Sequence, residues 1–361
     1  MRVLTVVGNR PQFVKAAAVS RPLRAVHEEV LLHTGQHFDD ALSAIFFREL
    51  ELPVPDRQLA IAGGSNTSQT ARMLSALEPV LGELAPDCVL VYGDTNSTLA
   101  GALSAAQAGV PVAHVEAGMR SFDRTMPEEI NRVLADHVSA LLLCSSPVAM
   151  ANLAREGVAG ETELVGDVMV DVALALQPRA RARVDLVVAR GLVAGEYALV
   201  TAHRSGNVDD PPRLQALVAL LEALPLPVIF PVHPRTRSRL EAADLYGRLE
   251  ARESVRLTGP LGPLELTALL CHARVALTDS GGLQKEAYLA GVPCITLRPS
   301  TEWTETVESG WNVLVDLDAG QALAALERPL PSEHPSLYGD GQAAQRIVAA
   351  LGRLAPRLRH A

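Results

Sequence analysis

The chain has 361 residues, of which 48% are hydrophobic, and its formal net charge is −9. This length predicts two domains, and the acidic balance argues against a protein that binds nucleic acid through a basic face. No apolar run is long enough to span a membrane and the first residues predict a strand instead of a cleavable signal, so we expect a cytoplasmic protein.

Short apolar runs alternate with longer helical patterns, which is typical of parallel α/β folds. In the first half, strands are predicted at residues 3–7, 29–33, 88–92, 112–115 and 141–144, and helices at 97–108 and 129–138. In the second half, strands are predicted at 197–201, 228–231, 254–257, 275–277 and 294–297, and helices at 211–223 and 283–289. Because the strand runs are continuously rich in Val, Leu and Ile, we expect helices to cover both faces of each sheet.

The two series of strands predict two Rossmann-like, doubly wound domains. We place an N-terminal domain at residues 1–170 and a C-terminal domain at 171–341, with the boundary near an arginine-rich segment. A last helix within residues 342–361 is expected to pack back on the first domain. Ligands of such sheets bind beyond the carboxyl ends of the strands, so the residues that follow each strand are the candidates for a site.

Charged residues follow the first and third strands of the first domain. Arg10 and Lys15 come after the first strand, where Gly8 allows a tight turn and a helix N-terminus predicts an anion site. The same string is also compatible with an ordinary helix start. Asp94 follows the strand at 88–92, although Asp94 or Asn96 would equally serve as the cap of the next helix.

Two glutamates complete this edge of the first sheet. Glu116 closes a Val-rich strand, where its burial is costly unless the carboxylate is used in chemistry or paired, with Arg120 as the structural alternative. Glu128 stands at a predicted helix start, where acidic residues are common, and Arg132 lies one turn further on the same face. Because neighbouring carboxylates push their pKa values apart, Asp94, Glu116 and Glu128 together predict an acid and a base in one pocket.

The second domain has a similar edge. His203 follows its first strand, and His233 follows its second, where a packed or capping histidine is the alternative. A later helix is preceded by Ser280, Gly281 and Gly282. Their backbone N–H groups predict a phosphate site, although an ordinary turn has the same composition. Glu286, one turn into that helix, is a candidate acceptor for ribose hydroxyls. Two such half-sites predict a ligand with two ends.

A metal or nicotinamide cofactor has little support in the sequence. The ten histidines include no H-E-x-x-H motif, and His33 and His37 lack a convincing third ligand. No strand is followed by G-x-G-x-x-G. The four cysteines lie far apart and predict reduced, buried thiols. We therefore expect no metal and no cofactor.

The polar strings form an ordered set along the chain. They are GNRP (8–11), YGDTNST (92–98), HVEAGMR (114–120), PEEINR (127–132), TAHR (201–204), TDSGG (278–282), TE (301–302) and YGDG (338–341). In this order and over nearly the whole chain, the set resembles the non-hydrolysing UDP-N-acetylglucosamine 2-epimerase family.

The resemblance implies a GT-B fold, with a nucleotide-sugar in the cleft between the two domains, and a homodimer without metal or nicotinamide. It also implies a reaction that inverts C2 of the sugar in surface-polysaccharide synthesis. Anti elimination of UDP gives a 2-acetamidoglucal, and UDP then adds back to C1 while a proton reaches C2 from the opposite face. This chemistry needs a base for the C2 proton, an acid on the other face, and cations for the diphosphate.

The resemblance also assigns roles to the candidate residues. The family's three acidic positions match Asp94, Glu116 and Glu128, and His203 matches a position near the departing diphosphate. Its phosphate-side cations match Arg10 and Lys15, and its nucleotide contacts match residues 280–282 with Glu286.

Several positions depart from the family's usual strings. Gln12 stands in place of a glutamate, Gly206 replaces another glutamate, and Trp303 replaces an arginine. Gln36 and His37 keep part of the activator site of bacterial members, but the Arg-Gln pair of a nearby loop is missing, so we expect no activation by substrate.

These departures leave alternative functions open. Gln12 and Trp303 resemble the branch that acts on UDP-2,3-diacetamido-2,3-dideoxyglucuronate. A GT-B glycosyltransferase, which would also need an acceptor site, is the alternative of another class. A nucleotide-sugar-binding protein without turnover is a third.

Overall fold

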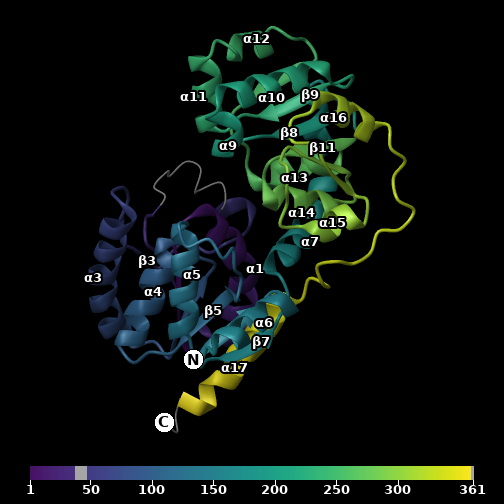
Figure 1. The fold of residues 1–361 in the computed structure, drawn as a ribbon. Coiled ribbons are helices and arrows are strands. Elements are labelled where there is room, and N and C mark those ends of the chain that lie inside the picture. Colours follow the sequence, from purple (N-terminus) through teal and green to yellow (C-terminus); the bar gives the residue numbers. More distant parts are fainter. Residues whose placement is uncertain (37–46, 359–361) are drawn as a thin grey trace. The chain divides into compact units, whose positions relative to one another are not determined.

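The computed structural model describes residues 1–36 and 47–358. The chain divides into two compact units (Figure 1), the first made of Met1–Val172 with Tyr338–Ala361 and the second of Ala173–Leu337. In the described part of the chain, no helix is long and apolar enough to cross a membrane.

The first unit is built on a parallel sheet with the strand order β3-β2-β1-β4-β5-β6-β7. Its strands are β1 (Arg2–Val7), β2 (Glu28–His33), β3 (Arg57–Gln58), β4 (Cys88–Tyr92), β5 (Val112–Ala117), β6 (Leu141–Cys144) and β7 (Glu161–Leu164). Its helices include α1 (Arg10–Val26), α3 (Asn66–Leu84), α4 (Asn96–Gln107), α5 (Pro127–Val138), α6 (Pro147–Glu156) and α17 (Ala343–Leu358). The order reverses between β1 and β4, which is where doubly wound sheets bind ligands.

The second unit repeats this topology with the order β10-β9-β8-β11-β12-β13, again parallel. Its strands are β8 (Ala198–Thr201), β9 (Val228–Pro231), β10 (Val255–Thr258), β11 (Val275–Thr278), β12 (Cys294–Thr296) and β13 (Asn312–Leu314). Helix α7 (Val168–Arg181) leads into it, followed by α8 (Val184–Val188), α9 (Ser205–Val208), α10 (Pro211–Ala223), α11 (Pro234–Ala242), α12 (Tyr246–Glu250), α13 (Pro263–Cys271), α14 (Gly281–Ala290), α15 (Thr304–Glu308) and α16 (Ala319–Leu326). The prediction of two doubly wound α/β domains is confirmed.

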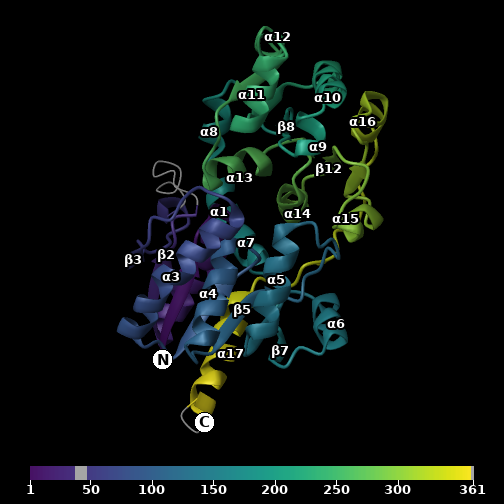
Figure 2. The ribbon, with the colours of Figure 1, turned by 60° about the vertical axis from the view of Figure 1, so that its left-hand side comes forward.

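Helices bury both faces of the first sheet. Successive side chains of a strand point to opposite faces, so Val3 and Val7 of β1 pack in one apolar cluster, and Leu4 and Val6 in another. The first cluster contains residues of α1 and of α17, including Ile347. Figures 1 and 2 show α17, in yellow, against the sheet of the first unit. The end of the chain therefore completes the core of the unit in which the chain begins.

The sequence did not predict β3, β7 or β13, each of which is an edge strand. β3 has only two residues, both exposed, and β7 has the mostly polar sequence Glu-Thr-Glu-Leu. An edge strand is paired on one side only, so it can be short and polar, and it then lacks the apolar run that marks a central strand.

Candidate functional site

The turn between β1 and α1 is fixed by buried hydrogen bonds. Asn9 caps α1 by accepting a hydrogen bond from the backbone N–H of Gln12, and a Cβ at Gly8 would collide with the Ser97 hydroxyl. The Gln12 amide accepts from the Gly8 N–H and donates to the Tyr92 carbonyl oxygen at 2.9 Å. An ionised glutamate, the residue that is usual at this position in the family that the sequence resembles, could not donate the hydrogen bond to Tyr92. Gln12 therefore fixes the turn with a bond that this glutamate cannot form. Arg10 begins α1 and is half-buried.

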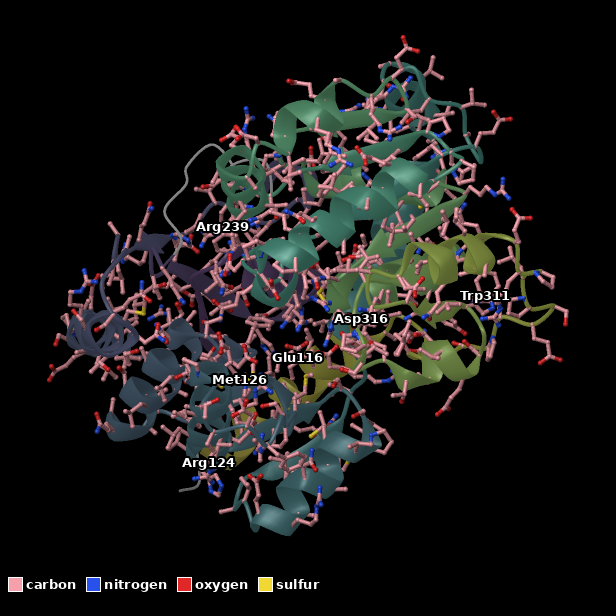
Figure 3. The ribbon with its side chains drawn as sticks, turned by 45° about the horizontal axis from the view of Figure 1, so that its top comes forward. Glu116, Arg124, Met126, Arg239, Trp311 and Asp316 are labelled. Carbon is pink, nitrogen blue, oxygen red and sulfur yellow. The ribbon has the colours of Figure 1, made fainter. Side chains whose placement is uncertain are left out.

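Lys15 of α1 and Glu116 of β5 form a largely buried ion pair. Glu116 (Figure 3) lies at a register shift in β5, between Val115 and Ala117, and has a left-handed backbone with φ of +69°. This conformation is costly for a residue other than glycine and is concentrated at functional sites. A Cβ at Gly93 would lie 3.1 Å from Lys15 Nζ, so the glycine at the end of β4 makes room for the pair. Burial alone lowers the pKa of Lys15, but the Glu116 carboxylate outweighs burial and raises it.

Two structural alternatives predicted for the acidic residues are wrong. Glu116 does not pair with Arg120, because the Arg120 guanidinium is held by Asp136 and Glu156 at 2.7 Å each. Asp94 does not cap α4 and neither does Asn96, because Thr95 is the N-cap and forms a capping box with the residue three further on. Asp94 forms an ion pair with Arg132 of α5 instead.

The two glutamates at the start of α5 have different environments. Glu129 is buried, accepts hydrogen bonds from the backbone N–H groups of Ser121 and Phe122, and lies 3.2 Å from Arg132. Glu128 is exposed, and within the described residues no hydrogen bond or ion pair joins it to Asp94, Glu116 or Arg132. The structure thus brings four of the predicted residues of this edge into two ion pairs, whereas Glu128 is exposed on the first turn of α5.

The edge of the second unit is organised by a buried carboxylate. Asp279, at the end of β11, accepts hydrogen bonds from the backbone N–H groups of His203 and Arg204 at 3.0–3.1 Å. It also accepts one from the Asn207 side chain at 3.1 Å. The His203 Nδ1 atom lies 3.5 Å from Asp279, and the rings of His203 and His233 are 5.4 Å apart. Sequence reasoning did not single out Asp279, because an acidic residue before Ser-Gly-Gly looks like part of the turn.

A pocket at this edge is lined by five of the predicted residues, namely His203, His233, Ser280, Gly282 and Glu286. Ser280 is the N-cap of α14, whose first turn has backbone N–H groups available to a phosphate. His233 is the N-cap of α11, which confirms the alternative of a capping histidine. Burial raises the pKa of the Glu286 carboxyl to about 7, and neighbouring Lys285 offsets part of this effect.

Trp303 lies against the same turn. Lys285 Nζ stands 4.1 Å from the centre of its ring, which is the geometry of a cation–π contact. A Cβ at Gly281 would lie 3.2 Å from Trp303 Nε1, so the indole lies against the N-terminus of α14. Glu302 is held by Arg298 at 2.8 Å and 3.0 Å.

Metal ligation has no candidate in residues 1–36 and 47–358, where no group of three or more His, Cys, Asp or Glu side chains could hold an ion. His37 lies outside the described residues. The four cysteines are free, and all but Cys271 are buried.

A family model described as UDP-N-acetylglucosamine 2-epimerase matches residues 23–352. The chain belongs to this family. The resemblance inferred from the strings at the strand ends is therefore confirmed.

Individual members of the family are similar to the chain over nearly its whole length. It is 45% identical to the UDP-2,3-diacetamido-2,3-dideoxy-D-glucuronate 2-epimerase of Pseudomonas aeruginosa, over 98% of this chain and 100% of that one. It is 40% identical to a UDP-N-acetylglucosamine 2-epimerase of Methanocaldococcus jannaschii, over 97% of this chain and 99% of that one. The crystal structure of the M. jannaschii UDP-GlcNAc 2-epimerase in complex with UDP-GlcNAc and UDP has a TM-score of 0.86 at 40% identity, and the match covers 98% of this chain and 100% of that one.

Proposed function

We propose that the chain is a non-hydrolysing 2-epimerase that interconverts UDP-N-acetylglucosamine and UDP-N-acetylmannosamine. The observation that carries this proposal is the set of two ion pairs, Lys15–Glu116 and Asp94–Arg132, at the carboxyl edge of the first sheet. Carboxylates and cations at one edge are what an elimination of UDP needs. Family membership over residues 23–352 and the relatives named above support the same reaction.

In the proposed reaction, each unit has its own task. In the second unit, the N-terminus of α14 binds the diphosphate, and Glu286 accepts hydrogen bonds from the ribose. In the first unit, a carboxylate removes the C2 proton while the C1–O bond breaks and its electron pair leaves with UDP. A second acid then returns a proton to C2 from the opposite face, as a UDP oxygen attacks C1. Asp94, Glu116 and Glu128 are the proposed acids and bases, and Lys15, Arg10 and His203 balance the charge of the leaving group.

UDP-2,3-diacetamido-2,3-dideoxyglucuronate is the second candidate substrate. The 45% identity to the P. aeruginosa enzyme favours it. Trp303, which stands where the family usually has an arginine, resembles that branch, and its indole lies against the N-terminus of α14. Both substrates call for the same chemistry at C2.

A proton NMR time course in D₂O tests this function, with UDP-N-acetylglucosamine and no added metal or cofactor. We expect the anomeric signal of UDP-N-acetylmannosamine to appear and deuterium to enter at C2. A parallel sample with the diacetamido-glucuronate sugar identifies the preferred substrate from the ratio of kcat/KM values. Release of free N-acetylmannosamine would indicate a hydrolysing enzyme, and no change in either sugar would contradict the proposed function and leave a glycosyltransferase or a binding protein.

We also propose that the enzyme works in the cytoplasm as a homodimer. The free cysteines fit a reducing compartment. Met126, which is the N-cap of α5, and Ile130 and Leu134 within the helix are spaced four residues apart and are all exposed, the last two by 47% each. Such a stripe on one helix face supports an interface with a second copy of the chain.

Replacing Ile130 and Leu134 together by glutamate should convert the dimer to a monomer. Four like charges would then meet across the interface, and we expect the dimer affinity to fall by about 100-fold or more. Light scattering coupled to size exclusion gives the mass of each form. Val188→Glu, at an exposed valine of α8, is the matched control and should leave the dimer intact. A double variant that keeps the wild-type dimer mass would exclude this face of α5 as the interface.

A further inference from the structure

A fully buried histidine lies directly behind the acidic edge of the first unit. His114 is on β5, two residues before Glu116. Its Nδ1 atom is 2.7 Å from a carboxylate oxygen of Asp136, and its Nε2 atom is 2.7 Å from the Gly93 carbonyl oxygen. A carbonyl oxygen and an ionised carboxylate only accept hydrogen bonds, so both ring nitrogens must donate. His114 is therefore present as an imidazolium ion.

Its partner Asp136, on α5, is equally buried and fully engaged. The second carboxylate oxygen accepts a hydrogen bond from the Gly118 N–H at 3.1 Å and one from Arg120 at 2.7 Å. Arg120 is itself buried and also binds Glu156 through two hydrogen bonds of 2.7 Å. The two cations and two anions balance, which makes the burial of a charged histidine tolerable. Burial alone lowers the pKa of His114, but the Asp136 carboxylate outweighs it, so the pKa is raised.

The network holds the backbone on both sides of the acidic edge. The Gly93 carbonyl that His114 binds belongs to the peptide bond leading into Asp94, and the Gly93 N–H donates to the Val115 carbonyl at 3.0 Å. The Gly118 N–H that Asp136 binds lies two residues after Glu116. Gly93 and Gly118 both have positive φ, at +62° and +79°, and so does Glu116, at +69°.

Such a backbone needs external support. Left-handed conformations of residues other than glycine cost free energy, so they persist only where contacts with the surrounding structure hold them in place. No other side chain described near the site holds both the Gly93 carbonyl and, through its partner, the Gly118 amide.

We propose that His114 is a positioning residue of the epimerase reaction: as a buried imidazolium it fixes the Gly93–Asp94 peptide and, through Asp136, the strand end that carries Glu116. The inference rests on the proposed function for its effect on turnover. It assigns His114 no contact with the substrate. Its charge and its two hydrogen bonds keep Asp94 and Glu116 at the places where Arg132 and Lys15 pair with them.

The protonation state is tested first, on the wild-type enzyme, by ¹⁵N NMR of histidine-labelled protein. We expect one histidine with two protonated, slowly exchanging ring nitrogens at neutral pH, and we expect its signals to vanish in H114N. A neutral ring for His114 at pH 7 would overturn the inference. This measurement needs no turnover, so its result does not depend on the proposed function. The proposed function is contradicted separately, if the wild type converts neither UDP-sugar.

The positioning role is tested by the split between kcat and KM. For H114N we expect kcat to fall by about 30-fold or more, while KM and the affinity for UDP change by less than about threefold. The reason is that Asp94 and Glu116 would be displaced, whereas the proposed nucleotide contacts in the second unit would not change. His137→Gln is the matched control, since His137 lies 3.6 Å from Glu156 at the outer end of the network and holds neither glycine. Its kinetics should match the wild type.

A second variant covers the case in which H114N does not fold. Asp136→Asn keeps the size of the side chain but removes the charge that keeps the ring protonated. We expect the same split, together with loss of the doubly protonated signal. A wild-type kcat in a folded H114N or in D136N would show that the network supports the fold but does not affect turnover, and it would overturn the proposal.

Discussion

Glu116→Gln is expected to lower kcat by about 10²–10⁴-fold, which is the usual contribution of a single acid or base, with little change in UDP affinity. Glutamine keeps the shape of the side chain and its hydrogen bond from Lys15, but it cannot take up or release a proton at C2. The loss should therefore fall on the chemical step and not on the second unit, where the nucleotide is proposed to bind. Steady-state kinetics with UDP-N-acetylglucosamine and calorimetric titration with UDP separate the two effects.

A double-mutant cycle sharpens this test. Lys15→Met removes the other half of the pair, and because the two side chains act as one unit, the double variant should be little slower than the slower single variant. Glu83→Gln, at an exposed acidic residue paired with Arg57 far along the sheet, is the control and should keep full activity. Near-normal turnover in Glu116→Gln would remove this residue from the acid–base chemistry and direct attention to Asp94 and Glu128.

The location of these residues could be predicted from the sequence, but their partners could not. Parallel strands bring their carboxyl ends to one edge, so a residue that follows a strand is placed by the strand pattern alone. Its partner is placed by tertiary packing. Lys15 and Glu116 are 101 residues apart in the sequence. Arg120 is only four residues from Glu116, and the local sequence gives no reason to prefer Lys15 over Arg120 as the partner of Glu116.

Buried carboxylates were the residues that sequence reasoning missed. Asp136 and Asp279 are fully buried. Asp136 accepts a hydrogen bond from the backbone N–H of Gly118, and Asp279 accepts hydrogen bonds from those of His203 and Arg204. The strings around them resemble an ordinary helix and an ordinary turn, because their function depends on donors that the fold supplies. For Glu128, the structure gives an exposed first turn of α5, so its catalytic role stays a prediction, and Glu128→Gln is the variant that tests it.

Asp279→Ala is expected to weaken UDP binding strongly and to lower the free energy of unfolding by about 2–4 kcal/mol. The substitution leaves the backbone N–H groups of His203 and Arg204 and the Asn207 amide without their acceptor in a buried site. Each unsatisfied buried group costs about 1–3 kcal/mol, part of which is recovered if water enters. Release of the His203–Arg204 backbone also opens one wall of the pocket at α14, so we expect the affinity for UDP to fall by at least about 100-fold.

Calorimetric unfolding and UDP titration of the same preparation measure the two effects together. Asp209→Ala is the matched control: this exposed aspartate pairs with Arg235 and Arg239 on the same unit but binds no backbone group beside the pocket. It should leave UDP affinity unchanged. Loss of stability in Asp279→Ala with full UDP affinity would show that the carboxylate supports the fold but not the nucleotide site. In that case the pocket at α14 would no longer explain how the second unit holds UDP.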